Sequence, residues 1–209
     1  MSVTVAPSYP VYRQPLGLPA GSIRAALSLL IVGLFLLLLA LPSDKQVVIP
    51  LYLYFLLCMV LVFFAAHGHS IAPEGVAHPS PWWLPRGTLR LLITLAIIGV
   101  VAWQFYVDPE KVIDRVTPHP GQLAQWPYLM MSLVGGFLLG WLIRRGPWRD
   151  AYWFQDLRAW IALIAMLILC GEILVRAFIN PNIAEGHNVP FMERLLVAIV
   201  AFYFGVRCS

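Results

Sequence analysis

Three arginines stand near the start of three long apolar runs, where a membrane helix presents its free amide groups. They are Arg24, Arg90 and Arg158. The positive end of the helix dipole attracts anions, so three such arginines converging on a pseudo-threefold axis would form an anion site. Arginines at these positions also reach lipid headgroups and set the topology of the chain. We expect this second role here.

Glu172 and Arg176 are the one pair of ionisable residues inside a long apolar run, residues 157–178. Their spacing of four residues puts both side chains on one face of a helix. Charged side chains within a membrane often mark proton or ion pathways. Glu172, however, follows Arg158 by 14 residues, which is about 21 Å along a helix and close to the far membrane surface. We therefore expect a structural ion pair that faces neighbouring protein.

Metal-binding residue types gather after the second apolar run, at His67, His69, Glu74 and His78. Side chains at i and i+2 of a helix diverge, and Gly68 is expected to end the helix between the two histidines. The sequence therefore predicts no metal site and no cofactor.

The apolar runs contain few polar side chains of the kind that an enzyme uses: Ser28, Thr94, Gln104 and Ser132. Catalysis needs a nucleophile, a base and an electrostatic stabiliser that converge, and no base stands beside these residues. The sequence predicts a protein that is not an enzyme.

The elements that carry all these residues are membrane helices. Of 209 residues, 60% are hydrophobic and 11% are charged, against roughly 25% charged in a soluble domain. The net charge is +4, and the positive residues stand singly beside apolar runs, a placement that sets topology and does not favour nucleic-acid binding. The expected partners are the lipid bilayer and other membrane protein subunits.

A repeated motif organises the apolar runs. Residues 18–24, LPAGSIR, recur as residues 84–90, LPRGTLR, and a degraded third copy covers residues 156–158. The spacing between the three arginines is 66 (90 − 24) and 68 (158 − 90) residues. Two residues before each arginine stands Ser22, Thr88 or Asp156, which we expect to be the N-cap of a helix.

A second apolar run follows each motif, at residues 47–66, 126–143 and 191–206. The sequence thus predicts an all-α membrane protein with six transmembrane helices, arranged as three tandem helical hairpins in one membrane domain. The hairpin repeats are residues 22–67, 84–145 and 156–207, preceded by a Pro-rich cytoplasmic tail, residues 1–21. The sixth run is short, so its helix must begin with Glu193 and Arg194 at the interface or be shielded by neighbouring helices.

Positive residues predict the orientation of the six helices. If each first helix starts in the cytoplasm, nine of the 14 lysines and arginines lie on that side and five on the other. This asymmetry favours cytoplasmic N and C termini. The expected location is the prokaryotic cytoplasmic membrane.

Small residues indicate where helix backbones approach closely, because lipid supplies no hydrophobic drive between helices. The expected packing residues are Gly33, Gly99, Gly136, Gly140, Ala201 and Gly205. The second and third pairs have the spacing of four that is typical of helix–helix contacts.

Two functions remain compatible with these features. The first is a non-catalytic membrane subunit with a structural or assembly role in a larger membrane protein complex, with the tail docking on a partner. The alternative is a channel or carrier for a small solute, in which the three arginines select anions.

Overall fold

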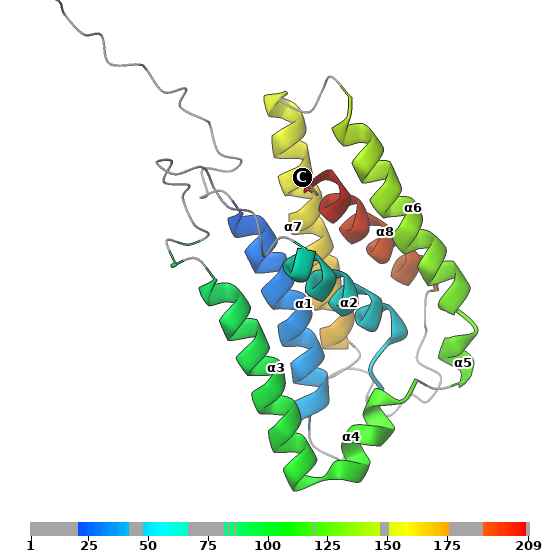
Figure 1. Cartoon of the computed structure of the whole chain (residues 1–209). Helices are drawn as coiled ribbons and strands as arrows, with labels where there is room; N and C mark the ends of the chain where they lie inside the picture. The colour runs from blue at the N-terminus through cyan, green and yellow to red at the C-terminus, as the bar shows by residue number, and fades with distance from the viewer. Residues whose placement is uncertain are drawn as a thin grey trace, which may run out of the picture.

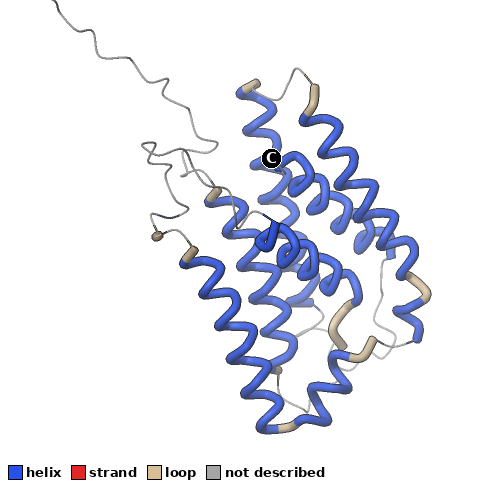
Figure 2. The backbone as a smooth tube through the Cα atoms, in the orientation of Figure 1, coloured by secondary structure: helices blue, strands red, loops and turns tan. Residues whose placement is uncertain are grey.

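The computed structural model describes residues 21–41, 48–66, 82, 84–85, 87–118, 120–146, 151–175 and 190–207. Within these ranges the regular structure is entirely helical (Figures 1 and 2). The helices are α1 (Ser22–Ala40), α2 (Leu51–Ala66), α3 (Thr88–Val107), α4 (Pro109–Val116), α5 (Pro120–Leu123), α6 (Trp126–Arg144), α7 (Tyr152–Leu174) and α8 (Pro190–Arg207). Helices α1, α3, α6 and α7 are long and apolar enough to cross a membrane. The predicted class, an α-helical membrane protein, agrees with this finding.

Four helices form the centre of the molecule. Contacts run from α1 to α2, from α2 to α8, from α8 to α7 and from α7 back to α1. The other two long helices lie outside this group, with α3 on α1 and α6 on α8 and α2, so that they flank the centre on opposite sides (Figure 1). The two helices of the second expected hairpin are therefore separated by the helices of the first and third.

Consecutive long helices alternate in direction. Helices α1, α3 and α7 run downward in Figure 1, and α2, α6 and α8 run back upward. The connection from α3 to α6 passes along the lower end, through α4 and α5. Residues 1–20, including most of the expected tail, lie outside the described residues.

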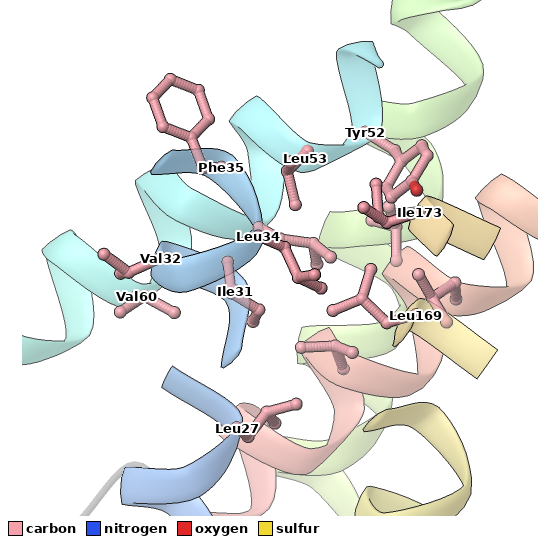
Figure 3. Packing of buried hydrophobic residues seen from close by; sticks show 14 of the residues in the cluster. Leu27, Ile31, Val32, Leu34, Phe35, Tyr52, Leu53, Val60, Leu169 and Ile173 are labelled. Atoms are coloured by element: carbon pink, nitrogen blue, oxygen red, sulfur yellow. The ribbon is translucent and has the colours of Figure 1, made fainter. Parts of the chain in front are cut away.

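The core is built mainly around α1, which is apolar on nearly every side. Leu27 and Ile31 are fully buried and belong to one cluster of buried residues with Leu53 of α2 and Leu169 of α7. Figure 3 shows Ile31, Leu53 and Leu169 pointing into the space between the three helices. Lipid tails are as apolar as these side chains, so complementary van der Waals packing is what stabilises the arrangement.

The starts of α1 and α3 differ from the expected caps. Gly21 and Gly87 are the N-cap residues, both with φ of 87°, and Ser22 and Thr88 are the first residues of the helices, so the predicted serine and threonine caps are wrong. Glycine adopts this left-handed conformation without the steric cost of a Cβ atom. The Thr88 hydroxyl instead donates a 2.7 Å hydrogen bond to the Pro85 carbonyl.

The third copy of the motif does not share this geometry. Helix α7 begins at Tyr152, after an extended Ala151, so Asp156 lies inside the helix and the prediction that it is an N-cap is wrong. The four residues before Asp156 extend the helix because none of them is a glycine or proline. The repeated backbone geometry is thus confined to the first two copies.

Helix α8 is shielded by its neighbours, which is one of the two arrangements expected for the short sixth run. It begins at Pro190 and carries Glu193, 5% exposed, in its first turn. The Arg194 guanidinium lies 4.2 Å from the centre of the Tyr128 ring on α6. Contacts with α2, α6 and α7 bury most of its apolar residues.

Candidate functional site

Helices α6 and α8 form the most extensive helix pairing among the described residues, and small residues lie at its centre. Gly136 faces the backbone of Ala198, and a Cβ atom placed there would lie 2.9 Å from the Ala198 Cα. Gly140 faces Phe202 and Val206 of α8 in the same way. These neighbours are backbone atoms, which cannot rotate away from an added side chain.

The pairing is reciprocal, since Gly205 of α8 faces the backbone of Phe137 on α6. Ala201 is fully buried within α8. Close approach brings backbone carbonyls of one helix to the glycine Cα atoms of the other, a geometry in which Cα–H···O contacts add to van der Waals attraction.

The structure does not bring Gly33 or Gly99 against a neighbouring helix. Both are exposed, and a Cβ atom at either position would have nothing within 4 Å among the described atoms. Gly33 and Gly99 therefore stand at equivalent points of the repeat and meet no neighbouring helix among the described residues.

The three arginines of the repeat lie on helices with different surroundings. The Arg24 guanidinium lies over the ring of Phe63 on α2, 5.0 Å from its centre, and Arg158, 8% exposed, lies 4.8 Å from the centre of the Phe154 ring. Arg90 is half-buried on the flanking helix α3. Because α3 packs on α1 from outside, these helices do not surround a common axis as three equivalent units.

Aromatic contacts extend from Arg24 into the centre of the bundle. The Phe63 ring packs edge-on against Phe204 of α8, with centroids 5.0 Å apart. Such an aromatic pair contributes about 0.5–1.5 kcal/mol beyond the area it buries, and a cation over a ring contributes about 0.5–2 kcal/mol depending on its desolvation. Arg24, Phe63 and Phe204 therefore tie α1, α2 and α8 together at the end where α1 begins.

Glu172 is half-buried near the end of α7. Arg176, its expected ion-pair partner, lies outside the described residues, as do His67, His69, Glu74 and His78. The predicted pair stays a prediction.

The end of α1 carries a polar site built on a buried arginine of α4 that the sequence did not single out. Arg115 of α4 is 6% exposed, and its Nη1 donates hydrogen bonds to the carbonyls of Leu38 (3.0 Å), Leu39 (3.2 Å) and Leu41 (2.6 Å). Carbonyls at the end of a helix lack partners within the helix, and the negative end of the helix dipole favours a cation there. Arg115 thus caps α1 from more than 70 residues away in sequence.

Tyr54 of α2 joins the same site. Its hydroxyl donates hydrogen bonds to the carbonyls of Val116 (3.0 Å) and Arg115 (3.3 Å) at the end of α4. Its ring packs edge-on against Phe35 of α1, with centroids 5.5 Å apart. We call Arg115, Tyr54 and the three α1 carbonyls the α4 junction, and it holds α1, α2 and α4 in one arrangement.

Local sequence explains why α4 forms. The Asp108 carboxylate accepts a 3.1 Å hydrogen bond from the Lys111 amide, Pro109 occupies the first helical position, and the Thr117 hydroxyl donates to the Ile113 carbonyl at 2.6 Å. Aspartate before proline is a strong signal for the start of a helix, and it was available in the sequence. The target of Arg115 was not, because it depends on how α4 folds back onto α1.

The described residues contain no group of three or more histidines, cysteines, aspartates or glutamates placed to hold a metal ion. Their buried polar and charged side chains are Ser22, Ser28, Arg115, Arg158 and Glu193. These belong to four different helices. The identified hydrogen bonds of Arg115 join α4 to the end of α1, whereas the identified contact of Arg158, with Phe154, lies within α7. No protein-family model, curated protein or solved structure matches the chain.

Proposed function

We propose that this chain is a non-catalytic integral membrane subunit with a structural role in a larger membrane protein complex. The proposal rests on the contrast between the tightly packed centre of the protein and its exposed apolar flanks. The four central helices are packed with apolar side chains, whereas the flanking helices α3 and α6 expose broad apolar surfaces.

The described interior supports a scaffold better than a solute pathway. A channel or carrier needs polar or charged groups lining a common path. Between α1, α2, α7 and α8 the fully buried side chains are almost all aliphatic or aromatic, and Ser28 is the one buried polar residue well inside α1. The buried charges of these helices, Arg158 and Glu193, lie toward the starts of α7 and α8, so midway along the helices a small hydroxyl offers little to a hydrated anion.

The exposed surface of α3 is suited to contact with other membrane components. Ile93 is its one buried residue, and Leu91, Leu95 and Ile98 are each about 60% exposed. Lipid can cover these residues, and so can a neighbouring subunit with a complementary helix. Because α3 is held mainly by α1, a partner on its outer side would add to its stability.

Six membrane-spanning helices with cytoplasmic termini in a prokaryotic cytoplasmic membrane complete the proposal. Among the described residues, the end where α1, α3 and α7 begin carries Arg24, Arg90, Arg144, Arg145 and Arg158, with Asp156. The opposite end carries Lys111, Arg115 and Arg194, with Asp108, Glu110, Asp114, Glu172 and Glu193. An excess of positive charge at one end supports placing that end in the cytoplasm.

The test is purification of the full chain from its native membrane in a mild detergent, followed by native mass spectrometry. The expected result is a complex of fixed stoichiometry with another membrane protein. Deletion of residues 2–16 should release that partner while the shortened chain still inserts, because the first apolar run and Arg24 are intact. A chain that purifies alone, and that supports anion flux in proteoliposomes, would refute the scaffold function in favour of a channel.

A further inference from the structure

Helix α4 presents two chemically different edges on either side of its contact with α1. Successive residues of a helix are rotated by about 100°, so Val112, Val116 and Ile113 share one arc and Glu110, Asp114 and Lys111 share another. Val112 and Arg115 are buried and mark the direction of the bundle. The apolar and charged edges therefore point to opposite flanks of α4.

The apolar edge is exposed among the residues that the structure describes. The exposed fraction is 58% for Ile113 and 39% for Val116, and Glu110 and Asp114 on the charged edge are exposed as well. A helix with one apolar and one charged edge is the form that lies in a membrane interface.

The position of α4 in the chain places it directly after the end of a long apolar helix. Asp108 alone separates α4 from α3, a helix long and apolar enough to cross a membrane. The last turns of α3 carry Trp103 and Tyr106, 64% and 86% exposed. Tryptophan and tyrosine concentrate at the level of lipid headgroups, because one end of each ring system is apolar and the other is polar.

The α4 junction keeps this edge at a fixed height. Arg115 binds the end of α1 and Tyr54 binds the end of α4, so α4 cannot move away from the end of α1 without breaking these hydrogen bonds. We propose that α4 is an interfacial helix with phospholipid as its partner. Its apolar edge, formed by Ile113 and Val116, inserts into the boundary between headgroups and acyl chains. Its charged edge then lies in water.

Site-directed spin labelling of the full chain tests the proposal. Cys58, Cys170 and Cys208 are replaced by alanine, and single cysteines are introduced as Ile113→Cys, Val116→Cys and Asp114→Cys for nitroxide attachment. The labelled protein is placed in vesicles of phosphatidylcholine and phosphatidylglycerol. Collisions with oxygen, which concentrates in lipid, and with a water-soluble nickel chelate are then measured for each label. Leu95→Cys, on the exposed surface of α3, serves as the control for lipid exposure.

The expected result is that labels on the two edges of α4 show opposite preferences for oxygen and nickel. Labels at 113 and 116 should collide more often with oxygen than with nickel, as at 95, and the label at 114 should show the opposite order. Equal nickel accessibility at 113 and 114 would place α4 in water and overturn the proposal. Low accessibility to both reagents at 113 and 116 would mean that protein covers the edge, which also overturns it. Thermal unfolding unchanged by each cysteine confirms that the labelled proteins are folded.

Discussion

Replacement of Arg115 by methionine is the sharpest test of the α4 junction. The change keeps a long apolar stem but removes the guanidinium that donates to the carbonyls of Leu38, Leu39 and Leu41. Arg115 is 6% exposed, so water does not replace these hydrogen bonds freely. A hydrogen bond to a charged group contributes about 1.5–3 kcal/mol, and three carbonyls that share one nitrogen do not add fully.

We expect Arg115→Met to lower the free energy of unfolding by about 1.5–3 kcal/mol, the range for a hydrogen bond to a charged group, because the three carbonyls share one nitrogen. Arg115→Lys should recover part of this loss, because lysine keeps the charge at the end of α1 but lacks the planar fork of donors. Unfolding by denaturant in detergent micelles, followed by far-UV circular dichroism, measures the free energies of unfolding of the unchanged chain and of both variants.

The matched control is Arg145→Met at the other end of the molecule. The Arg145 guanidinium is exposed and lies 3.6 Å from the centre of the Trp141 ring, a contact within one helix. A much smaller loss is expected there, because no buried carbonyl loses its partner. If Arg115→Met and Arg145→Met destabilise the protein equally, or if Arg115→Met has no effect, the capping role assigned to Arg115 is wrong.

Three other predictions concern packing, hydrogen bonding and orientation. Gly140→Leu should separate α6 from α8 and lower the midpoint of thermal unfolding in detergent. Gly33→Leu, at a position with open space around it, should leave the midpoint nearly unchanged. Equal effects of the two substitutions would contradict the assigned packing. Tyr54→Phe removes the hydroxyl that donates to Val116 and should cost about 0.5–1.5 kcal/mol of unfolding free energy in the same denaturation assay, and no loss would mean that this hydrogen bond does not hold α4. A cysteine introduced at position 114 in intact cells should react with a membrane-impermeant maleimide, whereas protection of that cysteine until the cells are opened would reverse the proposed orientation.

Membrane class and most long helices were determined by the sequence alone. An apolar run of about 20 residues matches the thickness of the hydrocarbon core of a bilayer, and backbone groups within it must bond to one another. Of the four helices long and apolar enough to cross a membrane, α6 nearly matches the expected run 126–143, whereas α7 begins before the expected cap Asp156. The repeated LPxG motif located the starts of α1 and α3, although the glycine and not the following hydroxyl residue supplies the cap. The sequence likewise marked Gly136, Gly140 and Gly205 as candidates for helix packing, but it did not identify the backbones that they face.

Which helices pack together was decided only by the tertiary structure. In lipid, an apolar helix gains nothing from merely burying apolar area, so periodicity does not indicate its partner, and the choice rests on the steric fit of particular surfaces. Hence the repeat suggested three equivalent hairpins, while the described structure separates α3 from α6 around a four-helix centre. The role of Arg115 has the same origin, because its hydrogen bonds to the end of α1 exist only after α3 and α4 have folded back against that helix.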